Sequence, residues 1–113
     1  MTLGYCHGKL SEAVFEMCTS TASLKVRLRL SLKHGFTAFP DDIFADPIRH
    51  QLGEVKAAFA GVELNFDAMR PPDALDNMKP SAVRRLVGKV ISLRETVAQE
   101  YFGQKFRRQT IRQ

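Results

Sequence analysis

One uninterrupted helical pattern near the C-terminus does most to limit the folds open to this 113-residue chain. Pro80 suits the first turn of a helix and Gly103 is the next residue able to end one, which predicts a helix of about 23 residues and ~35 Å. Apolar residues recur along it at helical spacing, at Val83, Leu86, Val87, Val90, Leu93, Val97 and Tyr101. A helix this long with one broad apolar face is expected to form the centre of the fold.

Two other segments carry shorter helical patterns. Residues 9–18 place a small apolar stripe on one face, formed by Leu10, Ala13, Val14 and Met17. Asp46 suits an N-cap with Pro47 at the first helical position, and Gly61 suits a helix end. The apolar stripe between these signals consists of Ile48, Leu52, Val55 and Phe59. Both segments are therefore predicted to be amphipathic helices.

Residues 24–34 fit two structures. Their apolar side chains alternate strictly, which is the period of a half-buried strand. Leu, Lys and Arg nevertheless favour helices, only Val26 is β-branched, and Gly35 suits the left-handed end of a helix. We predict a helix that packs through Leu24, Leu28 and Leu32. The alternative is a two-stranded ribbon built from residues 24–32 and 62–66.

Together these patterns predict an all-α fold, a small helical bundle of three to four helices built around the long C-terminal helix. An α+β fold with the two-stranded ribbon is the alternative. We expect residues 1–103 to form a single helical domain and residues 104–113 a basic C-terminal extension. Residues 61–79 are long for a structureless loop, which predicts a short helix within residues 72–78. The predicted core includes Leu52, Phe59, Leu86, Val90 and Val97.

Composition and cysteine content indicate the compartment. No window approaches the ~18 consecutive apolar residues of a membrane span, and the first residues lack the basic and apolar pattern of a signal peptide. Cys6 and Cys18 are too few for a disulfide framework, so we expect a reducing cytoplasm and no membrane association. Cys18 is expected to lie in the core, and Cys6 and His7 to be exposed.

The charge of the chain is distributed unevenly. Residues 1–34, 35–78 and 79–113 carry formal charges of +3, −5 and +7. We predict that the basic C-terminal region is the partner-binding surface, composed of Arg84, Arg85, Lys89, Arg94, Lys105, Arg107, Arg108 and Arg112. The expected partner is another protein or a second copy of the chain. Nucleic acid is the alternative, because clustered Lys and Arg bind phosphates, although no nucleic-acid-binding motif accompanies them.

Arg94 is unusual among these cations because it falls near the centre of the apolar face of the long helix. A cation at such a position is costly unless it is paired or reaches solvent. We expect either a carboxylate from the same chain, with Glu16 or Glu54 as candidates, or a contact with a second subunit or another partner.

The residues that could bind a metal are scattered. Cys6, His7, Cys18, His34 and His50 lack the spacing of a zinc site, so no metal or other cofactor is predicted. His50 and Glu54 lie one helical turn apart but have no nucleophile beside them, and no small-molecule ligand is implied.

Arg29 and His34, with four residues between them, match the Arg-x4–6-His motif. In this respect the chain resembles HEPN-type ribonucleases, in which the pair, repeated across a dimer, places a cation and an imidazole at the scissile phosphate. The resemblance implies ribonuclease activity as a third function. The chain departs from the family at Leu30, where a polar residue is usual, and in the early position of the motif. We therefore expect a non-catalytic binding or regulatory protein that acts through helix-face contacts with other proteins.

Overall fold

The computed structural model describes the backbone of residues 1–112 and the side chains of residues 1–104. It contains the α-helices α1 (Leu3–Thr19), α2 (Leu24–Ser31), α3 (Asp46–Ala58) and α4 (Pro80–Arg112). Short 3-10 turns connect α2 to α3, namely η1 (Leu32–His34), η2 (Phe36–Ala38) and η3 (Asp41–Ile43). No strand occurs between residues 1 and 112, so the all-α prediction is confirmed and the α+β alternative is wrong.

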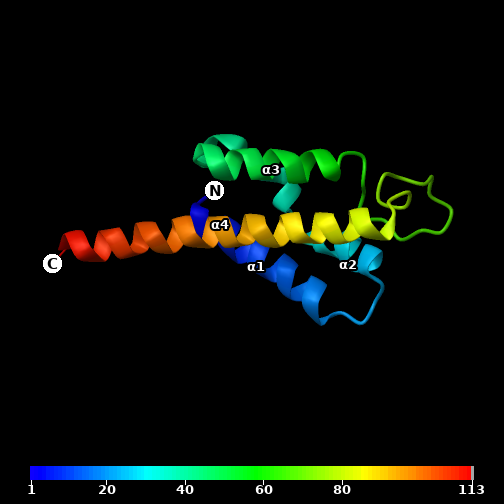
Figure 1. Cartoon of the computed structure of the whole chain (residues 1–113), viewed down its shortest axis with the longest axis horizontal. Helices are drawn as coiled ribbons and strands as arrows, with labels where there is room; N and C mark the ends of the chain where they lie inside the picture. The colour runs from blue at the N-terminus through cyan, green and yellow to red at the C-terminus, as the bar shows by residue number, and fades with distance from the viewer. Residues whose placement is uncertain (113) are drawn as a thin grey trace.

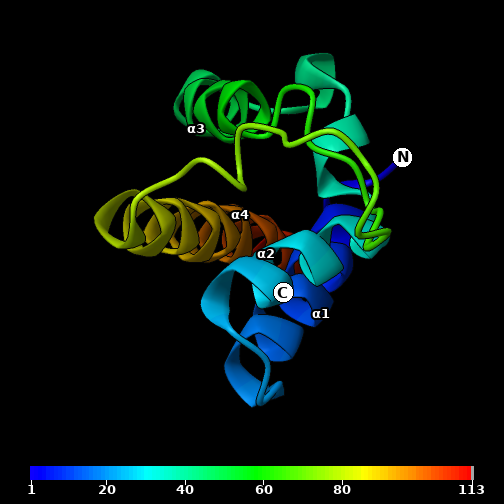
Figure 2. The ribbon, with the colours of Figure 1, turned by 90° about the vertical axis from the view of Figure 1, so that its right-hand side faces the viewer.

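α4 forms the centre of the fold, with α3 on one side and α1 and α2 on the other (Figures 1 and 2). Its inward-facing side chains are at most 3% exposed and comprise Val83, Leu86, Val90, Leu93 and Val97. The prediction that this helix ends at Gly103 is wrong, because α4 continues to Arg112 and its last turns project beyond α1 and α3 (Figure 1). Glycine inside a helix costs only about 1 kcal/mol relative to alanine, so Gly103 alone does not stop the helix.

α2 is helical despite its alternating sequence, which confirms the prediction for residues 24–34. The Ser23 side chain caps it by accepting a hydrogen bond from the backbone N–H of Val26. Leu28 is fully buried, and the neighbouring leucines one turn away are partly buried. η1 continues the same path to Gly35, whose φ of 74° is the left-handed conformation expected at the helix end.

α1 begins earlier than predicted, because the Thr2 side chain accepts a hydrogen bond from the N–H of Tyr5 and caps the helix there. The added turn places Cys6 on the buried stripe that continues through Leu10, Ala13 and Met17. The predictions for the two cysteines are both wrong: Cys6 is fully buried and Cys18 is exposed. Cys18 follows the last buried residue of the stripe by one position and therefore points to another face.

α3 packs its predicted stripe against α4. The four residues of this stripe, Ile48, Leu52, Val55 and Phe59, are buried, and Gly61, with a φ of 76°, lies in the turn that follows the helix. Asp46 is the first helical residue rather than the N-cap, which is Ala45. The predicted core residues are confirmed as buried, and the ring of Phe59 meets that of Phe36 edge to face at a centroid distance of 5.6 Å.

The segment between α3 and α4 differs from the prediction. The short helix expected within residues 72–78 is a hydrogen-bonded turn of residues 74–77. Leaving α3, this segment passes beside α2 and returns to the start of α4 (Figure 2). Within the described part of the chain, no helix combines the length and apolar content needed to span a membrane.

Candidate functional site

Residues 61–79 form a long irregular loop that is nevertheless fixed to the helical body; we call it the clamped loop. Its apolar attachments lie near its two ends, where Val62 and Met78 pack against the core and Leu75 is only 1% exposed. Ordered loops of this length are commonly functional. The polar contacts between these attachments determine the shape of the loop.

Arg29 of α2 is the main polar attachment. Its side chain is 4% exposed, and both terminal nitrogens donate to the Asp73 carboxylate at 2.6 and 3.0 Å. The same nitrogens also donate to Oδ1 of Asp76 at 3.2 Å and to the backbone carbonyl of Glu63 at 2.8 Å. A buried cation needs this number of acceptors to offset its lost hydration. Arg29 thereby connects both ends of the clamped loop to α2.

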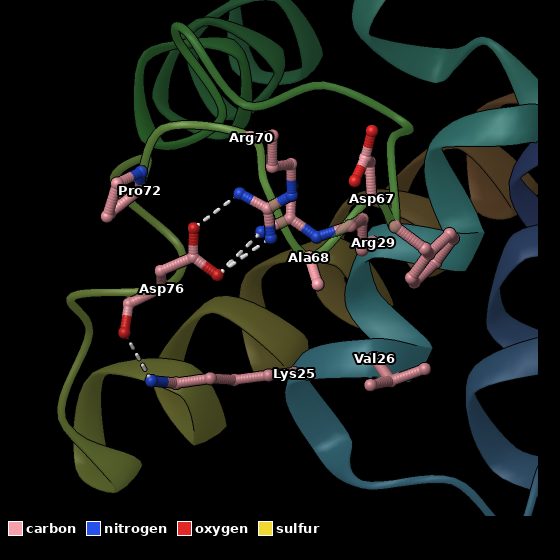
Figure 3. A pocket seen from close by; sticks show the side chains of 9 residues that line it. Lys25, Val26, Arg29, Asp67, Ala68, Arg70, Pro72 and Asp76 are labelled. Carbon is pink, nitrogen blue, oxygen red and sulfur yellow. Dashed lines mark hydrogen bonds and ion pairs between the residues drawn. The ribbon is translucent and has the colours of Figure 1, made fainter.

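Arg70 completes the ion-pair network from within the loop. Its terminal nitrogens donate to the two Asp76 carboxylate oxygens at 2.5 and 2.8 Å. Figure 3 shows the side chains of Arg29 and Arg70 converging on Asp76, while Lys25 of α2 donates to the Asp76 carbonyl at 2.8 Å. The hydrogen bond from Arg70 lowers the pKa of Asp76, and the hydrogen bond from Arg29 lowers the pKa of Asp73. Both carboxylates are therefore ionised at neutral pH.

The two aspartates also explain why the predicted short helix is only a turn. The backbone N–H of Asp73 donates to Oδ2 of Asp76 at 2.9 Å, and the N–H of Asp76 donates to Oδ1 of Asp73 at 3.2 Å. Aspartate side chains that bind nearby backbone N–H groups compete with helical hydrogen bonding. The same carboxylates thus shape the turn and hold the arginines.

A cavity of about 310 Å³ lies between the loop and α2 (Figure 3). It is lined by Lys25, Val26, Arg29, Phe66, Asp67, Ala68, Arg70, Pro72 and Asp76. Each of its cations already donates to an oxygen of the chain. No cluster of His, Cys, Asp or Glu suited to a metal ion occurs among the described side chains. Phe66 is the only aromatic residue among those that line the cavity.

Phe66 belongs to a group of exposed apolar side chains that we call the apolar tip, with Leu64 and Met69. These side chains are 50%, 48% and 89% exposed, respectively. The intervening backbone is ordered by two Asx turns, in which the Asn65 side chain accepts from the N–H of Asp67 and the Asp67 side chain accepts from the N–H of Met69, both at 2.9 Å. The three side chains lie within six residues of one ordered loop, and exposed apolar side chains of this kind are available for contact with a partner.

The described members of the predicted basic surface lie on different sides of α4. Arg84 lines a groove beside α2, whereas Arg85 and Lys89 line a groove beside α3. Lys89 also pairs with Glu54 at 3.5 Å, and Arg94 lies beside α1. The structure therefore does not bring these four residues onto one face. The side chains of Lys105, Arg107, Arg108 and Arg112 lie outside the described residues.

Arg94 has a different partner from those predicted. Its Nε donates to Oγ of Ser11 at 3.2 Å, and it forms no ion pair with any side chain up to residue 104. Glu16 instead pairs with Lys33 at 2.7 Å and His34 at 2.6 Å. Glu54 pairs with Lys89 and His50. The expectation of an internal carboxylate for Arg94 is wrong, since both candidates are held by other residues.

Arg29 and His34, the pair that resembles the ribonuclease motif, line separate cavities. Arg29 is enclosed by the carboxylates of the clamped loop, and the His34 ring lies between Glu12 and Glu16 of α1 at 3.2 and 2.6 Å. Within one chain, the cation and the imidazole do not share a site.

Sequence reasoning did not identify the clamped loop as a site. Two signals in the sequence point to it: Arg29 directly follows a core leucine in a helix, and Asp73 and Asp76 stand three residues apart after two prolines. Comparison with family models, with curated proteins and with solved structures gives no match to this chain. The function is therefore argued from the geometry of the site.

Proposed function

We propose that this protein is a non-catalytic, cytoplasmic binding module that contacts a partner protein through the clamped loop. The observation that carries this proposal is the exposure of Leu64, Phe66 and Met69 on a loop whose base is fixed by a buried arginine. An apolar tip is costly to expose to water, and burying each of these side chains in a partner is worth up to ~1.5–3 kcal/mol. The partner surface that fits it is an apolar pocket or groove.

The network around Arg29 supports this function by reducing the entropy lost on binding. A loop that is ordered before it meets its partner loses less conformational freedom than a mobile one. Phe66 supplies a rigid aromatic contact, and Met69 supplies a flexible thioether that adapts to an uneven surface. Fixed and adaptable contacts next to each other are a common basis for protein recognition.

The distribution of ion pairs favours a protein partner over nucleic acid. The acidic segment meets both basic segments within the chain, through Asp73 with Arg29 and Glu54 with Lys89. A nucleic-acid-binding surface needs its cations along one face that follows the phosphate backbone. The described cations of α4 are divided between several sides of the helix instead.

Affinity purification with matched surface variants tests this proposal. The full chain, a Phe66→Ser/Met69→Ser variant and an Ile43→Ser control would be used as baits in extract with and without nuclease treatment. Ile43 serves as the control because it is an exposed apolar residue outside the loop. We expect a protein that is retained by the wild type and the control but lost by the loop variant, and that binds the purified wild type with a Kd at least about tenfold lower than the variant. Identical retention by all three baits would refute a role for the apolar tip. Partners that disappear only on nuclease treatment would favour nucleic acid.

A further inference from the structure

A second surface, separate from the clamped loop, runs along α1 between α4 and η1. This surface contains a groove of about 870 Å³. Phe15 lines this groove and is 69% exposed. Ser11 and Cys18, which are within one turn of Phe15 on the same helix face, also line the groove. One large exposed ring is therefore flanked along the helix by small side chains.

The two edges of the groove differ in charge. On the α4 edge, Arg94 is half-buried, and its only hydrogen bond among the described residues is to Ser11. On the η1 edge, the Glu12 side chain is 55% exposed and contacts His34 at 3.2 Å and Lys9 at 3.5 Å. A cation without a carboxylate thus lies across Phe15 from an accessible carboxylate.

We propose that a second copy of this chain covers the groove in a two-fold symmetric dimer. A two-fold axis parallel to α1 brings the α4 edge of one copy against the η1 edge of the other. Arg94 of each copy then faces Glu12 of its partner, which forms two identical ion pairs. The Phe15 rings meet near the axis, where Ser11 and Cys18 leave room for them. This arrangement supplies the carboxylate that Arg94 lacks among the side chains of residues 1–104 of its own chain.

The dimer goes beyond the proposed function because it uses none of the residues of the clamped loop. Charge complementarity within a single groove is what selects a second copy as the occupant. An unrelated partner would have to supply a carboxylate opposite Arg94, whereas this chain already carries one, Glu12, on the opposite edge of the same groove. A dimer of this kind would present two apolar tips.

Charge reversal with mixing tests the proposal on the full-length chain. We expect sedimentation velocity at about 100 µM to show a dimer, and Arg94→Glu and Glu12→Arg each to weaken it at least about tenfold, because each places like charges at both pairs. An equimolar mixture of the two variants should recover the dimer, since both pairs in the mixed species are then of opposite charge. Phe15→Ser should weaken the dimer without changing the fold, because the ring is largely exposed.

Each other outcome overturns the inference. These outcomes are a monomer at this concentration, a dimer that withstands Phe15→Ser, and a mixture that fails to recover the dimer while circular dichroism shows both variants folded. Glu12 is exposed, so Glu12→Arg should leave the fold intact. This variant therefore tests the ion pairs even if Arg94→Glu disturbs packing. The Phe66→Ser/Met69→Ser variant should dimerise like the wild type, which separates failure of the dimer from failure of the loop proposal.

Discussion

At the scale of single residues, Arg29 has the largest predicted effect on the clamped loop. Arg29→Met removes the buried cation, leaves Asp73 with only the 3.4 Å contact to Arg70, and leaves Asp76 paired with Arg70 alone. Breaking such a pair by deleting one member costs about 3–5 kcal/mol. Urea denaturation should show a loss of this order in the free energy of unfolding. Arg85→Met, at an exposed position, is the control and should change it by less than ~0.5 kcal/mol. Equal stability of the two variants would mean that Arg29 does not hold the loop.

Asp73 and Asp76 make the stability of the protein depend on pH. Hydrogen bonds from the arginines hold the pKa of each carboxyl below its ordinary value of 3.8. A carboxyl group whose pKa is lower in the folded state contributes stability above its unfolded pKa, and that contribution is lost as the pH falls toward the folded pKa. We expect the melting temperature to fall below about pH 5, and to fall less steeply in Asp73→Asn. Thermal melts at a series of pH values measure this. An equally steep fall in melting temperature with decreasing pH in the wild type and in Asp73→Asn would contradict it.

At the scale of elements, Gly35 decides where the second helical segment ends. Its φ of 74° is unfavourable for a residue with a β-carbon, although no atom lies within 4 Å of that position. Gly35→Ala should therefore destabilise the protein by ~1 kcal/mol through backbone strain alone. Gly53→Ala in α3, which also has open space around it but lies within a helix, should stabilise by ~0.5–1 kcal/mol. Chemical denaturation of both variants measures the difference, and a shift of the same sign in both would contradict a left-handed Gly35.

The elements that could be predicted from the sequence carry their own local signals. Pro47 and Gly61 bracket α3, and the high helix propensity of Leu, Lys and Arg prevails over the strand-like alternation in α2. The start of α1 and the end of α4 are harder to predict from the sequence. The Thr2 cap extends α1 at its start, and Cys6 is buried while Cys18 is exposed, the reverse of the prediction. Gly103 does not interrupt α4.

The candidate site could not be predicted in the same way, because it depends on contacts between distant segments. Arg29 lies 44 residues from Asp73 and 47 from Asp76. The alternation in α2 does not by itself indicate which cation is buried, since Arg27 and Arg29 each stand between two apolar residues. The pairing becomes visible only when the fold brings the loop against α2.

At the scale of the whole molecule, part of the uneven charge of the sequence joins its segments. The acidic middle third supplies carboxylates to cations on α2, α3 and α4. Two surfaces among the described residues stand out beside this internal use of charge: the apolar tip of the clamped loop, and the α1 groove, where Arg94 has no carboxylate partner up to residue 104.

The central claim, that a long irregular loop is held rigid so that it presents an apolar tip, is tested most directly by backbone ¹⁵N relaxation of residues 61–79. We predict order parameters near 0.85, about those of a rigid helix, for the amides of Leu64, Phe66 and Met69. Values below about 0.6 at these amides, with α4 remaining rigid, would contradict the account, because a mobile loop would not present an ordered surface.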